Sequence, residues 1–389
     1  MARLGDYIEQ IRGVSYKPED VCTVQDKDAV AILRANNIQD DGLNFDDLVY
    51  VKKSKVSAIQ YIKAGDIVVC ASSGSKNLVG KAAIATEDME FSFGAFCKIV
   101  RPRKLLPSYV GHYFQSPKYR NKISELAGGA NINNIRNEHI DELDIVVPDT
   151  DEQERISIEL NKICYLISLR KQQFSKLDEL VKSRFIEMFG EPESNPLHWK
   201  MLPLENCLTV LGGYAFKSEE FKTSGVPVLR IGNINKGVFT STNMVYWSKD
   251  ASLERYQVQP GDLVISLTGT VGKDDYGNVC ILGNAYPLYY LNQRNAKLIL
   301  GKSLNKHYLS ELLKFSQIKK KLTGISRGVR QANISNRDIL NLVVPIPPIE
   351  LQTQFASFVE QIDKSKLAIQ KSLEKLETLK KALMQKYFG

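Results

Sequence analysis

The segment that comes nearest to a recognised chemical motif is a group of glycines and a lysine spaced almost as in a phosphate-binding loop. Such a loop has the form Gly-x-x-x-x-Gly-Lys followed by Ser or Thr, whose hydroxyl binds Mg²⁺. Five residues separate Gly74 from Gly80-Lys81, one too many, and Ala82 lacks the hydroxyl. Residues 269–274 also fail the pattern. We therefore expect no nucleotide-binding loop.

Histidines and cysteines lack the spacing of a metal site or of a catalytic group. The six cysteines occur singly, without a Cys-x-x-Cys pair, which fits reduced thiols in a cytoplasm better than disulfides or zinc. The chain contains no Asn-Pro-Pro-aromatic methyltransferase motif and no Gly-x-Gly-x-x-Gly after a predicted strand. We expect no intrinsic catalysis, no metal and no cofactor. The histidines without ligand or nucleophile spacing are His112, His139, His198 and His307.

Composition indicates a globular protein with a basic excess. The 389 residues allow two or three domains with real cores. A net charge of +8 favours a polyanionic partner. No run of about 18 apolar residues occurs, and the first residues lack the apolar core of a signal peptide. We therefore expect a cytoplasmic protein without a membrane span.

The chain contains an internal repeat, so we expect functional side chains at two equivalent sets of positions. The repeat is strict between residues 134–190 and 333–389, where matching residues lie 199 apart. Upstream, Gly65-Asp66 matches Gly261-Asp262 at a spacing of 196. The copies diverge most at residues 76–90 and 273–287. One scaffold presenting two different surfaces is the simplest interpretation. The strict pairs include Asn134/Asn333, Pro148/Pro347, Gln153/Gln352 and Phe189/Phe388.

Each copy divides into a globular and a helical part. β-Branched runs at 65–70 and 261–266 predict strands, while residues 108–114 and 306–313 predict helices, so the fold class is α+β. We expect Asn134 and Asn333 to be turn or helix-cap residues. The predicted parts are globular segments 1–147 and 200–346, long helices 148–190 and 347–389, and a linker at 191–199.

The two helical parts show heptad periodicity with polar interruptions. Arg170 and Arg184 interrupt the first apolar seam, and Lys366 and Lys380 interrupt the second at different heptad positions. Each helix therefore suits the other better than a copy of itself. The seams are Leu160, Ile163, Ile167, Phe174, Leu177, Val181 and Met188, and Val359, Ile362, Ile369, Leu373, Leu376, Leu383 and Tyr387.

Two divergent globular segments, each closed by a hydrophobic-proline element before a long helix, resemble the specificity subunit of Type I restriction-modification systems. The resemblance rests on Val146-Val147-Pro148 with residues 152–156, and on residues 344–352. It also rests on the two Gly-Asp strands and on Ser73-Gly74-Ser75 and Thr268-Gly269-Thr270. It covers essentially the whole chain. The two helix entries differ, because Asp149-Thr150-Asp151 stands where the second copy keeps a Pro-Pro pair.

This resemblance implies two pseudo-symmetric target recognition domains joined by two long helices that form an antiparallel coiled coil. Each domain would read one half of a bipartite, asymmetric double-stranded DNA target. The helices would set the spacer between half-sites and dock modification subunits, two of them in the expected complex. Restriction subunits would join through the assembled complex, and methyl transfer and cleavage would belong to these partners.

Basic residues of the globular parts are the candidate DNA contacts that follow. Lysines would neutralise phosphates, and arginines can also bind base edges in a bidentate manner. For each of them a solvated surface charge is the alternative. The segment 324–330, rich in Gly, Ser and Arg, is the best candidate for close backbone approach to DNA. The candidates are Lys52, Lys53, Lys55, Lys76, Lys81, Arg101, Arg103 and Lys104, and Lys217, Arg230, Lys273, Arg294, Lys319, Lys320, Lys321, Arg327 and Arg330.

Two other functions fit the same chain. A nuclease or methyltransferase with unrecognised motifs would show activity of the isolated chain with magnesium or S-adenosylmethionine. A coiled-coil scaffold without DNA specificity would let a scrambled duplex compete as well as the true target.

Overall fold

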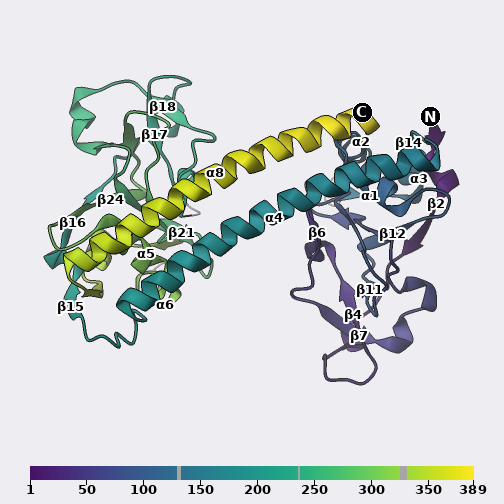
Figure 1. Ribbon diagram of the computed structural model, residues 1–389, viewed down its shortest axis with the longest axis horizontal. Helices are drawn as coiled ribbons and strands as arrows, with labels where there is room; N and C mark the ends of the chain where they lie inside the picture. Colours follow the sequence, from purple (N-terminus) through teal and green to yellow (C-terminus); the bar gives the residue numbers. More distant parts are fainter. Residues whose placement is uncertain (129–132, 235–236, 325–330) are drawn as a thin grey trace. The chain divides into compact units, whose positions relative to one another are not determined.

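Two compact units make up the described part of the chain, which in this computed structural model is residues 1–128, 133–234, 237–324 and 331–389. Unit 1 is residues 1–173 with 368–389, and unit 2 is residues 174–367. Each unit contains one globular segment and one end of each long helix, α4 (Thr150–Phe189) and α8 (Ile349–Phe388) (Figure 1). The predicted mixture of helix and sheet and the two long helices are confirmed.

Unit 1 contains two four-stranded sheets and three shorter helices. The sheet orders are β10-β8-β12-β2 and β11-β4-β7-β3, and three two-stranded pairs, β1-β14, β9-β13 and β5-β6, complete the unit. The bounds are β1 (Ala2–Arg3), β2 (Ile8–Arg12), β3 (Val21–Cys22), β4 (Ala29–Leu33), β5 (Ile38–Gln39), β6 (Gly42–Leu43), β7 (Val49–Lys52), β8 (Ile67–Cys70), β9 (Ser72–Ser73), β10 (Ala82–Ile84), β11 (Ser92–Phe93), β12 (Cys97–Pro102), α1 (Pro107–Gln115), α2 (Pro117–Leu126), β13 (Asn133–Asn134), α3 (Asn137–Asp141) and β14 (Asp144–Ile145).

Unit 2 repeats this plan. Its sheet orders are β16-β24-β20-β22 and β18-β17-β23-β19, with the pairs β15-β26 and β21-β25. The bounds are β15 (Lys200–Pro203), β16 (Leu208–Gly212), β17 (Val226–Leu229), β18 (Val245–Trp247), β19 (Gln257–Val258), β20 (Leu263–Ser266), β21 (Thr268–Thr270), β22 (Val279–Ile281), β23 (Tyr289–Leu291), β24 (Asn295–Leu300), α5 (Lys306–Lys314), α6 (Ser316–Thr323), β25 (Gln331–Asn333), α7 (Asn336–Leu340) and β26 (Val343–Ile346).

The two copies share one arrangement of sheets and helices, which we call the frame, and they differ in one edge strand. Strand β4 lies between a parallel partner, β11, and an antiparallel partner, β7, and β17 lies likewise between β23 and β18. The fourth strand differs, since β3 extends the sheet beyond β7 whereas β19 extends it beyond β23. In the view of Figure 1, β4 and β7 lie farther from α1 than β12 does. The second four-stranded sheet of each unit, which contains β4 or β17, therefore differs more between the copies than the first sheet does.

One sequence expectation is wrong. Asn134 and Asn333 are neither turn nor helix-cap residues, because they lie in the short strands β13 and β25. Asn134 pairs with Ser72 of β9, and Asn333 pairs with Thr268 of β21. The Thr268 hydroxyl also donates a hydrogen bond to Asn333 Oδ1 at 3.0 Å. These long-range pairings cannot be seen in a local asparagine pattern.

The Gly-Asp strands of the two copies are built in the same way. Gly65 and Gly261 each have φ +86°, a conformation that favours glycine. Every residue of β8 and β20 is buried, as expected for inner strands rich in β-branched residues. Each Gly-Asp turn therefore leads into an inner strand of the first four-stranded sheet of its unit, β10-β8-β12-β2 or β16-β24-β20-β22.

Each long helix begins against the globular segment of its own copy through a buried glutamine. Gln153 accepts a hydrogen bond from the Leu106 amide at 3.0 Å and donates one to the Pro148 carbonyl at 2.9 Å. Gln352 likewise accepts from the Asn305 amide at 2.8 Å and donates to the Pro347 carbonyl at 2.8 Å. Each side chain thus joins the start of a long helix to the start of α1 or α5.

Each long helix ends against the globular segment of the other copy. In unit 1, the Phe388 ring lies 5.2 Å from the Tyr109 ring between centroids. In unit 2, the Phe189 ring lies 4.8 Å from the Tyr308 ring. Within each unit the two helix segments therefore run antiparallel. The Tyr387 hydroxyl donates to Glu159 at 2.5 Å in unit 1, for example.

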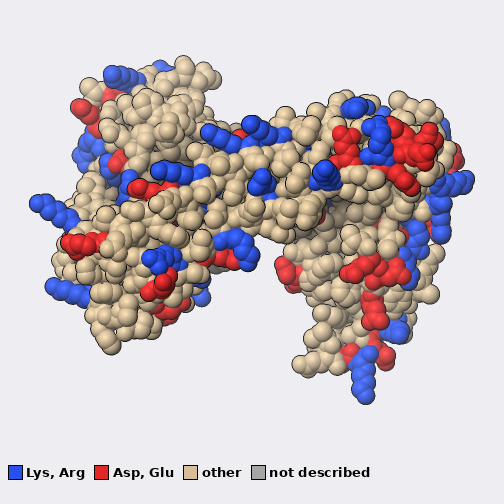
Figure 2. Space-filling view, in the orientation of Figure 1, with Lys and Arg blue, Asp and Glu red and all other residues tan. Residues whose placement is uncertain are grey.

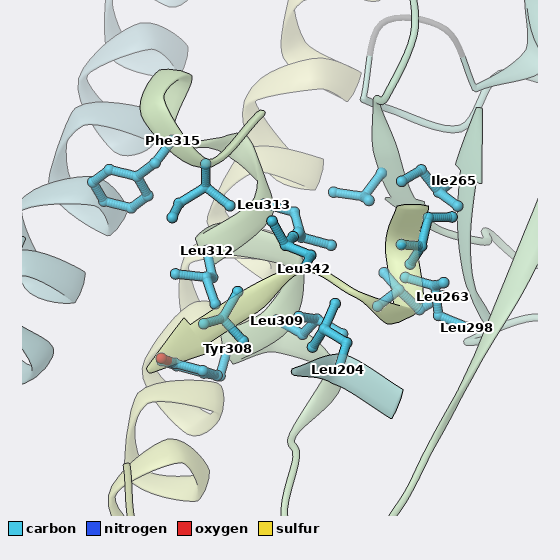
Figure 3. Packing of buried hydrophobic residues seen from close by; sticks show 14 of the residues in the cluster. Leu204, Leu263, Ile265, Leu298, Tyr308, Leu309, Leu312, Leu313, Phe315 and Leu342 are labelled. Carbon is cyan, nitrogen blue, oxygen red and sulfur yellow. The ribbon is translucent and has the colours of Figure 1, made fainter. Parts of the chain in front are cut away.

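The unit 2 core gathers around these aromatic rings. Phe185 stacks on Tyr308 with centroids 5.3 Å apart and meets Phe355 of α8 edge-on at 5.5 Å. Figure 3 shows Tyr308 and leucines of α5 facing Leu204 and Leu342, with the sheet residues Leu263, Ile265 and Leu298 beyond them. One polar interruption of the helix seam is accommodated, since Lys366 forms an ion pair with Asp178 at 2.5 Å.

No helix within the described ranges is long and apolar enough to cross a membrane.

The exchanged helix ends predict reciprocal effects of two matched substitutions. Phe388→Ala should destabilise unit 1, and Phe189→Ala should destabilise unit 2, each by about 3–5 kcal/mol because a fully buried ring is lost. Hydrogen exchange of the full chain, followed in peptides of α1–α2 and α5–α6, measures the two effects separately. Tyr165→Ala, at an exposed position of α4, is the control. Faster exchange of α5–α6 alone in Phe388→Ala would contradict this account.

Candidate DNA interface

The segments in which the copies diverge most, residues 76–90 and 273–287, begin in equivalent loops. In unit 1, residues 74–81 connect β9 to β10, and in unit 2, residues 271–278 connect β21 to β22. Both loops leave a two-stranded pair, β9-β13 or β21-β25. We call each loop, with the turn before β12 or β24 and the helix α2 or α6, the loop face of its unit. The same frame therefore presents different residues at equivalent positions.

The turns of the two loop faces carry side chains of opposite character. The Phe96 carbonyl accepts a hydrogen bond from the Ala71 amide at 2.9 Å, and the Arg294 carbonyl accepts one from the Leu267 amide at 2.8 Å. The two residues thus occupy equivalent places, and both are exposed. Phe96 is 68% exposed, which is unusual for a ring of this size. One face offers an apolar ring where the other offers a guanidinium.

Several sequence-predicted cations are exposed near these features. Lys76 and Lys273 lie on the two loops, and Lys320 and Lys321 lie on α6. Lys53 follows β7 at the end of the second sheet of unit 1. The side chains of these five residues and Arg294 have no ion-pair partner within the described part of the chain. They are the candidates best placed to meet a polyanion.

Arg101, another of the predicted cations, has an anionic partner inside its own unit. Its guanidinium forms two hydrogen bonds with the buried Asp66 carboxylate, at 2.7 and 2.8 Å, and this partner raises the pKa of Arg101. In the second copy the equivalent aspartate, Asp262, also forms an ion pair, with Lys297 of β24 at 2.7 Å. The two Gly-Asp motifs therefore supply an internal ion pair that braces the first sheet of each unit.

Other predicted cations also have partners inside their own unit. Lys55 pairs with Asp20 at 3.1 Å, Lys81 with Asp40 at 3.3 Å and Lys217 with Glu220 at 3.4 Å. Arg103 pairs with Glu9. The remaining contacts are Lys52 with the Glu19 carbonyl at 3.1 Å, Arg230 with the Asn243 carbonyl at 2.7 Å, Lys104 above the Tyr7 ring at 5.8 Å, and Lys319 with Asn278 at 2.6 Å and with Asp274.

Arg327 and Arg330, with most of the Gly/Ser/Arg segment, lie outside the described residues. Along the chain this segment follows α6, which belongs to the loop face of unit 2, and precedes β25.

Charge alone does not delimit the interface. On the face shown in Figure 2, Lys and Arg side chains are interspersed with Asp and Glu side chains. The position in the frame is therefore the more informative criterion.

Sequence reasoning missed two residues of the unit 1 loop face. Phe96 went unnoticed because an isolated phenylalanine suggests a core position. Arg120 of α2 donates hydrogen bonds to the Val79 and Asn77 carbonyls of the loop at 2.8 and 2.9 Å. The repeat could have identified it, since Arg120 lies 199 residues before Lys319.

The histidines and acidic residues show no metal-binding arrangement. Within residues 1–128, 133–234, 237–324 and 331–389, no group of three His, Cys, Asp or Glu side chains could hold a metal ion. His112 is buried beside Asn161, 2.8 Å from its amide oxygen, and burial lowers the pKa of this histidine to about 4. The buried His112 side chain is therefore uncharged at neutral pH.

Comparison with known proteins assigns the chain to a family. The family model described as "Type I restriction modification DNA specificity domain" matches twice, at residues 1–179 and 196–381. The EcoKI specificity subunit of Escherichia coli K12 is 31% identical over 97% of this chain and 86% of its own length. The StySPI specificity subunit of Salmonella potsdam is 42% identical over 44% of this chain and 37% of its own length.

Solved structures agree with the fold. The S subunit of a Type I restriction-modification system from M. genitalium matches with a TM-score of 0.57 at 16% identity, over 100% of this chain and 95% of that one. Two copies of the specificity domain fill most of the sequence, and similarity to a specificity subunit extends over nearly all of it. The chain therefore belongs to the specificity-subunit family of Type I restriction-modification systems.

Proposed function

We propose that this protein is the DNA sequence-recognition subunit of a Type I restriction-modification complex in the cytoplasm. Each globular segment reads one half of a bipartite, asymmetric target in double-stranded DNA. Methyl transfer and cleavage are performed by partner subunits and not by this chain. Family membership supports the proposal, and one observation carries the asymmetry: a duplicated frame bears two different loop faces.

The target recognition domains in this proposal are residues 1–147 and 200–346. Residues 148–190 and 347–389 are the long helices, and residues 191–199 are the linker. The shared frame orients both domains alike relative to their own helix segments, and the loops supply base selectivity. An apolar ring at Phe96 suits a thymine methyl group, whereas the Arg294 guanidinium suits the two acceptors of guanine.

Exposed lysines would provide affinity, and few of them would provide selectivity. Neutralising phosphates releases condensed counterions, so each such contact adds to the salt dependence of binding. Lys53 and Lys76 are the best candidates in the first domain, and Lys273, Lys320 and Lys321 in the second. Arg327 and Arg330 remain candidates from the sequence, because they follow α6 along the chain.

The long helices serve as spacer and docking platform in this proposal. Changing their length should change the spacer without altering either half-site. Leu180 of α4 and Leu379 of α8 lie 199 residues apart, and each is 47% exposed. Equivalent exposed apolar residues on two equivalent helices suit two copies of one modification subunit, since exposed apolar positions often mark interaction surfaces. Restriction subunits would join through the assembled complex.

Exchange of one domain tests the modular function. Replacing residues 1–147 with the corresponding segment of another family member should change one half of the methylated sequence and leave the other half and the spacer unchanged. Sequencing methylated bases in cells that carry the whole system measures this. Changes in both halves would refute independent recognition.

Removing exposed charge from the loop face of unit 2 should weaken all DNA binding. Lys320→Ala with Lys321→Ala should lower the slope of log K against log salt by about 0.9 per lost phosphate contact. Target and random duplexes should be affected alike. Titration of the assembled complex at several salt concentrations measures the slope. Lys302→Ala is a matched control. Lys302 is exposed after the end of β24, whereas Arg294, on the loop face, lies before the start of this strand. An unchanged slope in the double variant would exclude these lysines as phosphate contacts.

Replacing one exposed leucine of a long helix with glutamate should prevent one of the two modification subunits from binding. Leu180→Glu and Leu379→Glu should each reduce two bound subunits to one, because a carboxylate would be buried in an apolar contact. Native mass spectrometry of the complex counts the subunits. Gln172→Glu, at an exposed polar position of α4, should retain two. Retention of two subunits by both leucine variants would rule out this platform.

A further inference from the structure

In unit 1, the base of the divergent loop is held by a cation from the neighbouring helix. Arg120 of α2 donates from Nη1 to the Val79 carbonyl at 2.8 Å and from Nη2 to the Asn77 carbonyl at 2.9 Å. Val79 and Gly80 are buried against the unit, whereas residues 74–78 are exposed. The arginine therefore binds the loop where it enters the core and leaves its tip accessible.

In unit 2, a lysine performs the same task with different partners. Lys319 of α6 donates from Nζ to Asn278 Oδ1 at 2.6 Å and forms an ion pair with Asp274. The Lys319 side chain is buried, although lysines seldom are unless they are paired. Both partners belong to the loop 271–278, whose residues 271–274 are exposed. The loop is again fixed at its base.

The two cations occupy the same place in the repeat. Lys319 lies 199 residues after Arg120, the same spacing as in the strict part of the repeat. A glycine with positive φ completes each base. A Cβ at Gly80 would lie 2.5 Å from Ile123 of α2, and one at Gly277 would lie 3.2 Å from Thr323 of α6. The helices thus hold loops of unrelated sequence at one position.

The exposed loop tips also have a common composition. Lys76 with Leu78, and Lys273 with Val271, place a cation beside an exposed apolar side chain. A cation can bind a phosphate while an apolar group contacts a base edge. Ordering a mobile loop on binding costs conformational entropy, so a loop already fixed in the conformation that fits its half-site binds that half-site more tightly.

We propose that Arg120 and Lys319 are positioning residues that hold the recognition loops 74–81 and 271–278 in place for DNA, each for its own half-site. This rests on the function proposed above. The cations act through the loops, since their donors are engaged by loop acceptors. Loss of Arg120 removes a donor from each of two loop carbonyls, and loss of Lys319 removes one contact from Asp274 and one from Asn278.

Direct phosphate binding by these cations is the competing explanation, and salt dependence separates the two. A lost phosphate contact weakens binding to every duplex and reduces the salt slope. A lost positioning contact lowers the preference for the correct half-site and leaves the slope unchanged. The two roles therefore predict different measurements on the same variants.

The test uses the full chain assembled with its modification subunits. The probes are a duplex with the sequence methylated in cells carrying the whole system, and two duplexes in which one half-site is scrambled. Arg120→Ala should reduce discrimination at one half-site by about tenfold, roughly the worth of one base contact. Lys319→Ala should do the same at the other half-site only. Lys122→Ala on α2 is the matched control, because the ion-pair partner of Lys122 among the described residues is Glu125 of the same helix, at 3.9 Å.

Two further variants keep the test decisive if an alanine variant folds poorly. Asp274→Ala removes one of the two loop partners of Lys319, at an exposed residue. It should lower discrimination at the same half-site as Lys319→Ala, and should add no loss when the two are combined. Arg120→Lys can reach one carbonyl and should give an intermediate loss. Hydrogen exchange of the DNA-free complex should quicken in residues 74–81 or 271–278, according to the variant.

Equal loss at both half-sites, a reduced salt slope, or unchanged discrimination would overturn the positioning role. A wild-type complex that binds all three duplexes equally would instead overturn the proposed function itself.

Discussion

Reciprocal packing of the two helix ends is the interaction on which the rest of the structure depends. Phe388, at the end of the second copy, packs against Tyr109 of the first, and Phe189, near the end of the first copy, packs against Tyr308 of the second. Leu383, Met384 and Tyr387 enter the core of unit 1, and Val181 and Phe185 enter that of unit 2. Neither globular segment therefore has its complete core without a helix from the other copy. This explains why the repeat is strict through the helices.

The same physical logic separates the frame from the faces. Residues that close the frame recur with their contacts: Gln153 and Gln352 at the helix starts, and the ion pairs of Asp66 and Asp262 beneath the first sheet. Residues on the loop faces recur in position but not in kind, as Phe96 and Arg294 do. A frame fixed by buried hydrogen bonds and packing tolerates such exchange at exposed loops, because substitutions there cost little stability.

The sequence predicted the frame well because the repeat supplied a second copy of each signal. The α+β class, the two long helices and the family all follow from residues that recur 196 to 199 positions apart. Phe185 was missed because helical periodicity describes a seam between helices, whereas this ring packs on Tyr308 of α5 as well. The internal partner of Arg101 could not be predicted, because Asp66 is 35 residues away in sequence. Asn134 and Asn333 were misjudged because strand pairing is a tertiary property. The loop faces could not be predicted in the same way, because exposure and ion pairing, which are tertiary properties, determine which cations are available.

The central claim is that one duplicated frame carries two different readers of a single DNA target. Sequencing of methylated bases in genomic DNA, from cells carrying the unaltered chain with its partner subunits, tests this most directly. The account predicts one methylated sequence made of two short defined blocks that differ from each other and are separated by a spacer of fixed length and free sequence. A single contiguous block, two identical blocks, or methylation without sequence preference would contradict it.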